Sequence, residues 1–145
     1  MLTTIQRSAL VTHSAEAMYN LVNDVEQYPS YMEGCCGAEI LERGDDYMVA
    51  RLDLKKAGIS YSFATRNTLD PYQQINLQLH SGPFRQLRGA WTFKALTDQA
   101  CKVSLNLEFD ADSKLVGVAA SSLFASVANN LVSALTQRAD SVYGA

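Results

Sequence analysis

Residues 85–110 read RQLRGAWTFKALTDQACKVSLNLEFD and contain the clearest structural signal in the chain. Apolar and polar side chains alternate over 87–94 and again over 102–109, and Thr97-Asp98 interrupts the pattern between them. A period of two places successive side chains on opposite faces of a β-strand. The stretch therefore predicts two antiparallel strands that share one apolar face and one polar face.

The same kind of signal extends toward the N-terminus. Turn-forming residues separate further runs of strand-like sequence, so that strands are predicted at 3–11, 38–43, 47–54, 60–69, 74–80, 85–95 and 101–110. Helical signals flank the last six of these strands. Ser14 can cap a short helix, Asp24 begins a second short turn, and Pro29 is expected to end helical structure there. Apolar residues beyond Asp112 follow a helical period, which predicts one long helix from Ser113 to about Tyr143.

This order of elements predicts an α+β helix-grip fold. A sheet with one apolar face needs a cover, and the C-terminal helix is the only large one available. We expect a curved seven-stranded antiparallel sheet around that helix, with two short helices after the first strand and residues 1–145 in a single domain. A curved sheet cannot close on one straight helix without leaving space beside it. A cavity is therefore expected, with the short helices near its mouth.

Composition and charge restrict the class of protein. The chain has 145 residues, of which 48% are hydrophobic, as is typical of a globular protein. Its net charge of −3 weighs against a partner bound mainly through phosphates, and we expect no DNA partner. The N-terminal residues lack the basic start and apolar core of a secretory signal, so a cytoplasmic protein is expected.

One uncharged run bears on that expectation. Residues 115–137 contain no charged side chain and are numerous enough to cross a bilayer. Seven Ser, Asn and Gln side chains within the run make membrane insertion unfavourable. A buried amphipathic helix is the favoured interpretation.

The three cysteines do not predict metal or redox chemistry. Cys35 and Cys36 are adjacent, so they cannot easily direct both thiolates at one metal, and Cys101 alone cannot complete a site. No His or Asp is placed by sequence beside either thiol to activate it as a nucleophile. We expect one of the pair to pack inward and the other to face a loop, with no metal site and no catalytic residue.

The apolar face of the predicted sheet leaves two interpretations open. Large side chains of the strands face a helix rich in Ala and Ser. Such a combination fits a closely packed core, which the residues alone favour, or a void wide enough for a long apolar ligand. Tyr28 and Tyr31 would lie near the mouth of such a void, where amphipathic rings suit a quinone head. The predicted lining residues are Tyr28, Tyr31, Met32, Leu52, Phe63, Leu77, Leu87, Trp91, Phe93, Leu105, Leu123 and Val127.

Four basic residues come from the last two strands: Arg85, Arg88, Lys94 and Lys102. Parity places three of them, all except Arg85, on the polar face of the sheet. They form either an ordinary solvated surface or a contact patch for an acidic partner such as ribosomal RNA.

Four stretches resemble a known family: LVNDVEQYPSYMEGC (21–35), KAGISYSFATRN (56–67), SGPFRQLRGAWTF (81–93) and QRADSVYGA (137–145). Together they resemble the bacterial ribosome association toxin A family, which is related to the coenzyme Q-binding proteins of the START-like, polyketide cyclase-like superfamily. The resemblance covers nearly the whole chain. It implies a START-like helix-grip fold, in agreement with the periodicity.

The resemblance implies two alternative functions. One is the binding of ubiquinone or another prenylated quinone in the cavity, in support of respiration. The other is a toxin-like function, in which the protein binds the large (50S) ribosomal subunit, blocks 70S association and inhibits translation. A more distant resemblance to polyketide cyclases and dehydratases implies an enzyme, which is disfavoured because the inward strand positions supply almost no titratable groups.

Of these functions, the sequence favours a non-enzymatic binding protein. We expect a monomer that needs no cofactor, binds a hydrophobic small molecule such as a quinone or lipid, and makes transient membrane contact to exchange it. The 50S subunit is the alternative partner.

Overall fold

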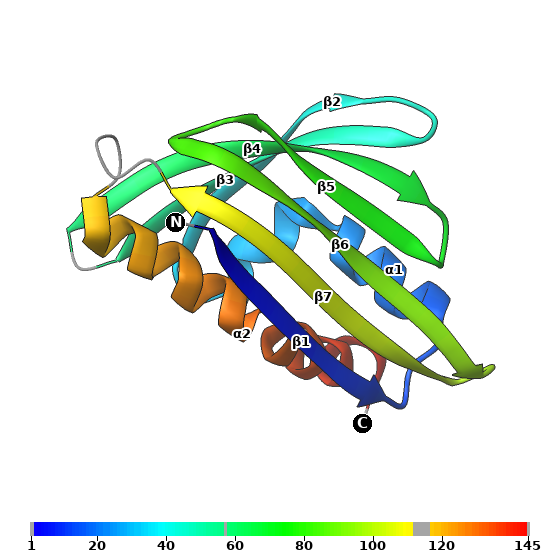
Figure 1. Ribbon diagram of the computed structural model, residues 1–145. Coiled ribbons are helices and arrows are strands. Elements are labelled where there is room, and N and C mark those ends of the chain that lie inside the picture. The colour runs from blue at the N-terminus through cyan, green and yellow to red at the C-terminus, as the bar shows by residue number, and fades with distance from the viewer. Residues whose placement is uncertain (1, 57, 112–116, 145) are drawn as a thin grey trace.

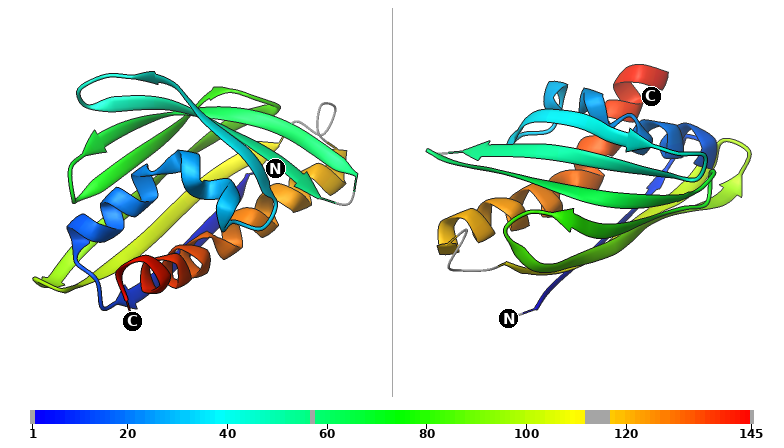
Figure 2. Two further views of the ribbon diagram at one scale, coloured as in Figure 1. Left: turned by 180° about the vertical axis from the view of Figure 1, so that it is seen from behind. Right: turned by 90° about the horizontal axis from the view of Figure 1, so that it is seen from above.

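The computed structural model of the chain describes residues 2–56, 58–111 and 117–144 (Figure 1). Within these ranges, seven antiparallel strands form one curved sheet around the long helix α2 (Gly117–Tyr143). Helix α1 (Ala15–Asn23) and the 3₁₀ helix η1 (Val25–Ser30) also lie on the concave side of the sheet, as the view from behind shows (Figure 2). The predicted helix-grip fold is thereby confirmed.

The strands form a meander with one exception. Their bounds are β1 (Thr3–Val11), β2 (Cys35–Arg43), β3 (Tyr47–Lys56), β4 (Ile59–Asp70), β5 (Gln74–Ser81), β6 (Phe84–Thr97) and β7 (Ala100–Ala111). From one edge to the other the order is β1-β7-β6-β5-β4-β3-β2, so β2 to β7 pair in chain order. The exception is β1, which pairs with β7 from the start of the chain, with Thr3 opposite Phe109 and Val11 opposite Cys101.

The alternation in β6 and β7 determines which face of the sheet is buried. Trp91 lies opposite Leu105, and Phe93 lies opposite Val103; all four side chains are buried on the concave face. One position beyond Phe93 and Val103, Lys94 and Lys102 lie opposite each other and are exposed on the convex face. The period of two read from residues 85–110 therefore assigns both faces correctly.

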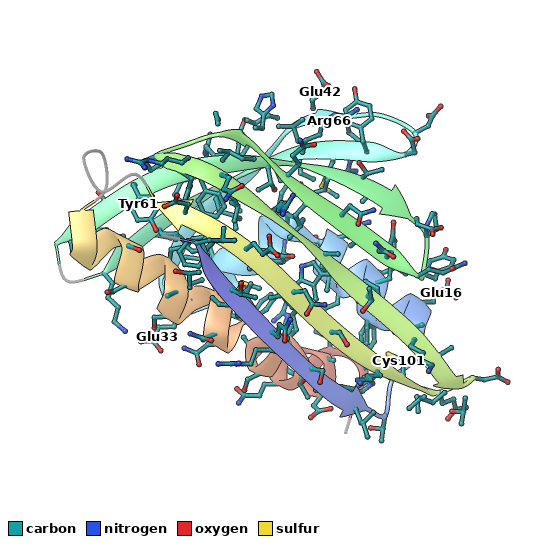
Figure 3. All side chains as sticks on the ribbon, viewed as in Figure 1. Glu16, Glu33, Glu42, Tyr61, Arg66 and Cys101 are labelled. Atoms are coloured by element: carbon teal, nitrogen blue, oxygen red, sulfur yellow. The ribbon has the colours of Figure 1, made fainter. Side chains whose placement is uncertain are left out.

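Four phenylalanines fill one end of the space between sheet and helix. Phe63, Phe84 and Phe109 come from β4, β6 and β7, and Phe124 comes from α2. Phe124 contacts the other three edge-on, with ring centroids 5.4, 5.0 and 4.6 Å apart. Tyr61 packs against Phe84 at the same end of the sheet, opposite the end that holds Cys101 (Figure 3). This phenylalanine cluster is a closely packed core, as such edge-to-face contacts favour.

The ends of several elements differ from prediction. The first helix begins as expected, because the Ser14 hydroxyl accepts a hydrogen bond from the backbone N–H of Ala17 at 3.0 Å. Helical structure does not stop at Pro29, however, since η1 continues to Ser30. Pro29 follows Tyr28, whose carbonyl accepts from the N–H of Tyr31, and proline is favoured at this second position of a turn.

Two further boundaries concern β2 and α2. Strand β2 begins at Cys35, three residues before the predicted start, because the Cys-Cys-Gly sequence pairs with β3 despite its lack of apolar alternation. Helix α2 ends at Tyr143, as expected. The predicted start at Ser113 lies outside the described residues.

Candidate ligand-binding cavity

A cavity lies between the concave face of the sheet and the helices, beside the phenylalanine cluster. Its volume is about 80 Å³. Strands β2 to β7, helices α1, η1 and α2, and the segment after η1 all contribute to its wall. The expected void beside the helix is therefore present.

Helix α2 explains why this region stays open. Where the phenylalanine cluster ends, the helix turns Val127, Ala128 and Leu131 toward the sheet. Ala128 is buried, but its single methyl group cannot reach across to the strands. On the opposite side, β4 contributes Thr65 and Asn67, which are smaller than the phenylalanine that precedes them on the same face. Small side chains on both sides leave the space unfilled.

Eight of the twelve predicted lining residues line this cavity, all within the described ranges. They come from the segment around η1, from four strands and from α2: Tyr28, Met32, Leu52, Phe63, Leu77, Leu87, Trp91 and Val127. The pattern of inward strand positions was sufficient to find the five that lie on strands.

The other four lie elsewhere. Phe93 is two residues beyond Trp91 on β6 and packs under α1, with its ring centroid 5.7 Å from that of Tyr19. Leu105 is fully buried in the core. Tyr31 and Leu123 line a more polar hollow between α2 and the segment that follows η1. This hollow adjoins the cavity and shares Met32, Val127 and Leu131 with it.

Sequence reasoning missed thirteen lining residues. Ten are apolar or a cysteine: Val22, Val25, Cys35, Ala50, Leu54, Ile75, Leu107, Phe124, Ala128 and Leu131. The other three are uncharged polar residues: Asn23, Thr65 and Asn67. The alternation in β4 contained the signal for the last two, because both share the parity of Phe63. Their polarity led to their omission.

The polar groups of the cavity have few hydrogen bonds. The Thr65 hydroxyl donates to Oδ1 of Asn67 at 2.7 Å. Asn67 is only 7% exposed, and Oδ1 of Asn23 is buried without a hydrogen-bond partner among the described residues. No Asp, Glu, Lys, Arg or His from the described ranges lines the cavity. Its wall is therefore apolar and uncharged, with a small number of polar atoms.

Two lining residues can ionise, and both stay protonated near neutral pH. Tyr28 donates its hydroxyl hydrogen to the carbonyl oxygen of Val22, and desolvation by burial holds its pKa well above the usual value. Burial also raises the pKa of the Cys35 thiol, to about 11. Neither group can accept a proton at pH 7. Tyr28 lines the cavity with its hydroxyl buried and bonded to the backbone.

The adjacent cysteines face opposite sides of β2. Cys35 is buried and Cys36 is exposed, so one packs inward as predicted. Cys36 faces away from the core on a paired strand rather than on a loop, which corrects that part of the prediction. Among the described residues, no group of three or more His, Cys, Asp or Glu side chains is placed to hold a metal ion.

The four basic residues do not form one patch. Arg88 pairs with Glu108 across the strands at 2.9 Å, so a carboxylate neutralises its charge. Lys94 and Lys102 lie opposite each other, about 20 Å farther along β6 at 3.3 Å per residue. Arg85 is exposed at the other end of β6. The two lysines are therefore a separate cationic pair.

The structure also bears on whether the uncharged run at 115–137 could cross a membrane. In the described part of the chain, no helix combines the length and the apolar character needed to cross a membrane.

Comparison with known proteins identifies the family. Residues 11–136 match the family described as polyketide cyclase / dehydrase and lipid transport. The ribosome association toxin RatA of Vibrio cholerae is 48% identical over 140 residues, with 97% of each chain covered. RatA of Escherichia coli is 46% identical over 141 residues, covering 97% of this chain and 89% of the relative.

More distant proteins are similar in sequence or in structure. The mitochondrial coenzyme Q-binding protein of Drosophila melanogaster is 24% identical over 135 residues, which cover 90% of this chain and 56% of that protein. A START superfamily protein from Mycobacterium smegmatis matches with a TM-score of 0.78 and 23% identity, over 96% of this chain and 98% of the other.

The Zhui aromatase/cyclase from a Streptomyces species matches with a TM-score of 0.80 and 22% identity, over 97% and 94% of the two chains. At these identities the solved structures establish the fold alone. The RatA proteins, by contrast, are nearly half identical over almost their full length. The chain therefore belongs to the ribosome association toxin family, within the polyketide cyclase / dehydrase and lipid transport family.

Proposed function

We propose that this protein is a non-enzymatic binding protein for ubiquinone or another prenylated quinone, and that it supports respiration. The observation that carries the proposal is the uncharged, largely apolar wall of the cavity. The distant relative named as a coenzyme Q-binding protein supports the choice of a quinone.

An isoprenoid tail suits the apolar part of the cavity. Each square ångström of apolar surface removed from water contributes about 25 cal/mol, before the loss of freedom on association. The ring of Trp91 and the side chains of Leu87 and Leu107 offer such surface on neighbouring strands. Because a tail is flexible, it can follow the curve of the sheet. We further propose that a monomer acts in the cytoplasm and touches a membrane transiently to exchange the ligand.

A binding function fits this cavity better than catalysis does. General acid–base catalysis needs a group whose pKa lies near the working pH. The two ionisable lining groups, Tyr28 and Cys35, both have raised pKa values. Among the described lining residues no carboxylate or imidazole is available instead. A fold neighbour is an aromatase/cyclase, but this wall lacks the residue types that such proton transfers use.

Ligand extraction tests the proposal. Organic extraction of freshly purified protein, followed by mass spectrometry, is expected to yield a prenylated quinone at a substantial fraction of one per chain. Titration of delipidated protein with a short-chain prenyl benzoquinone should quench the fluorescence of Trp91, which is the single tryptophan and lines the cavity. Absence of bound quinone together with no quenching would contradict the function.

A second candidate function is binding of the large ribosomal subunit, with a block of 70S association. The observation that favours it is the name shared by relatives that are 46–48% identical over 97% of this chain. The cationic pair of Lys94 and Lys102 is the surface feature best suited to phosphate contact, since no strand pairing places a carboxylate opposite either lysine. The two functions use different parts of the molecule and are therefore separable.

Sucrose-gradient profiles test the second candidate. Excess protein added to dissociated subunits is expected to reduce the 70S peak. The double variant Lys94→Glu, Lys102→Glu should weaken the effect and reduce its dependence on salt. Lys55→Glu, Lys56→Glu is the matched control, because it makes the same charge change in exposed residues at another site. Normal 70S formation at excess wild-type protein would rule the activity out.

A further inference from the structure

Three uncharged polar side chains interrupt the apolar wall of the cavity. Asn23 comes from the end of α1, and Thr65 and Asn67 come from β4. Apolar residues would fill these positions more favourably if the wall served only to pack a core, because buried amides need hydrogen-bond partners. The positions therefore require another explanation.

The hydrogen bonds leave both amides with unused capacity. The Thr65 hydroxyl donates to Oδ1 of Asn67, which fixes the rotation of that amide and turns its nitrogen away from Thr65. In the described part of the chain, no hydrogen bond involves this nitrogen. Oδ1 of Asn23 is buried and likewise has no partner in the described ranges. The cavity thus offers one unused donor group and one unused acceptor.

The wall also limits the charge that a ligand can bring. An ionised carboxylate or phosphate loses its hydration on entering an uncharged apolar space, and no cation among the described lining residues compensates for it. A neutral carbonyl oxygen can accept from the Asn67 amide nitrogen, and a neutral hydroxyl can donate to Oδ1 of Asn23. A pure hydrocarbon would leave the Asn67 nitrogen and the Asn23 oxygen without a partner.

We propose that Asn23, Thr65 and Asn67 form the head-group site of the cavity and select a neutral ligand with carbonyl or hydroxyl oxygens. Asn67 is the donor to a carbonyl, Asn23 is the acceptor for a hydroxyl, and Thr65 is a positioning residue that orients Asn67. A quinone carries carbonyl oxygens and its hydroquinone carries hydroxyl groups, so both forms can bind. This inference rests on the proposed ligand-binding function and adds the class of head group.

The test compares stability with affinity in one variant. Thr65→Val, Asn67→Leu removes both hydrogen-bonding partners and keeps branched side chains of similar shape. The double variant removes both members of the Thr65–Asn67 hydrogen bond together with the unused amide nitrogen, so it leaves no buried polar group without its partner. The midpoint of urea unfolding without ligand should therefore stay the same or rise. The affinity for a short-chain prenyl benzoquinone, measured by quenching of Trp91, should fall by about 3- to 10-fold.

A matched control makes the same chemical change on the other face. Thr68 on β4 lies opposite Asn76 on β5, and both are exposed. Thr68→Val, Asn76→Leu should leave quinone affinity within about twofold of wild type. Asn23→Leu should weaken the binding of the reduced, hydroxyl-bearing quinol more than that of the oxidised quinone.

Two competitors complete the test. An isoprenoid hydrocarbon of equal chain length should displace the quinone only weakly from the wild type and more readily from the Thr65→Val, Asn67→Leu variant. Oleate, an ionised lipid, should displace it poorly from both. Equal quinone affinity in wild type and variant, or oleate binding as tight as quinone binding, would overturn the head-group site while leaving ligand binding intact. Failure of quinone and hydrocarbon alike to bind the wild type would overturn the proposed function and the head-group site together.

Discussion

The space between the sheet and α2 has two parts that are built differently. At one end the phenylalanine cluster packs strand against helix, with Phe124 touching three other rings. Beyond Phe63 and Phe124, which also form part of its wall, lies the cavity. The same sheet and the same helix border both parts. The difference lies in side-chain size at successive turns and strand positions, and not in the backbone.

This difference indicates where stability and ligand binding are located. The filled end gains dispersion contacts and loses water from large apolar surfaces. The hollow part forgoes those contacts and keeps polar atoms that a core would exclude. Sites for ligands commonly depart from optimal packing in this way. Variants in matched pairs, one at each end, can test the division.

Truncating a ring in the filled end should have the largest effect. Phe109 is 2% exposed and contacts Phe84 and Phe124, so Phe109→Ala should lower the free energy of unfolding by about 3–5 kcal/mol. Leu77→Ala removes a half-buried side chain that already faces the cavity, and should lower it by about 2 kcal/mol or less. Urea denaturation of delipidated protein measures both. Equal losses would mean that the two ends do not differ in packing.

Enlarging a buried alanine of α2 should destabilise the protein where the core is packed but not where the helix borders the cavity. Ala139 is fully buried away from the cavity, so Ala139→Leu should destabilise the fold by about 1–3 kcal/mol. Ala128→Leu places the same added atoms in the cavity and should keep wild-type stability. It should lower quinone affinity about tenfold, because the new side chain overlaps the ligand. Normal quinone binding by Ala128→Leu, in the same fluorescence titration, would place the ligand elsewhere.

A glycine at the wall of the adjoining polar hollow should have an intermediate effect. Gly34 has a φ of +90°, and an added Cβ would lie 2.8 Å from Cγ2 of Val127. Gly34→Ala should therefore destabilise the protein by about 1–3 kcal/mol and push Val127 toward the ligand site.

Gly58 is the control for backbone conformation. Its φ is +83°, but an added Cβ would meet no atom within 4 Å. Gly58→Ala should show the conformational penalty of about 1 kcal/mol without a change in quinone affinity. If the two variants lose equal stability, the contact with Val127 has no energetic role.

Substitution of the adjacent cysteines should have the smallest effect, and this effect should appear in the pH dependence of the free energy of unfolding. The pKa of Cys35 is about 11 in the folded state against 9.0 for an ordinary thiol. Between these values the unfolded chain releases a proton that the folded protein keeps, so stability falls as pH rises from 9 to 11. The contribution of Cys35 is fully present below pH 9 and its loss reaches the order of 1 kcal/mol by pH 10.

The cysteine pair contains its own control. Cys35→Ala should flatten the decline in unfolding free energy between pH 9 and pH 10, whereas Cys36→Ala, at the exposed neighbour, should leave the slope of the wild type. Urea unfolding at pH 8, 9 and 10 distinguishes them. Parallel pH profiles for the wild type and Cys35→Ala would show that burial of the thiol is not coupled to folding.

Local periodicity was enough to predict most of the fold. Residues 87–94 and 102–109 alternate without interruption, and each strand and face they predicted is present. Prediction failed where pairing depends on a distant partner. Cys35 belongs to β2 because Leu54 pairs with it, and nothing in the sequence around Cys35 indicates that partner.

The site was harder to predict than the fold. Inward parity found Trp91 and Leu87, but it could not tell a cavity wall from the packed position of Phe93 two residues farther along β6. Thr65 and Asn67 had the right parity and the wrong polarity for a core, so the rule that recognises core residues excluded them. The supposed basic patch failed because Lys94 and Arg88, six residues apart on one strand, are far apart in space.

The pairing of β1 with β7 also determines when the sheet can be completed during synthesis. Thr3 is the partner of Phe109, a residue synthesised 106 positions later. At about 5–20 residues per second, the first strand waits roughly 5–20 s for its neighbour during synthesis. Helix α2 follows later still, so the segment that encloses the cavity leaves the ribosome after every strand of the sheet. A nascent chain released early would therefore expose the whole concave face to water and to other chains.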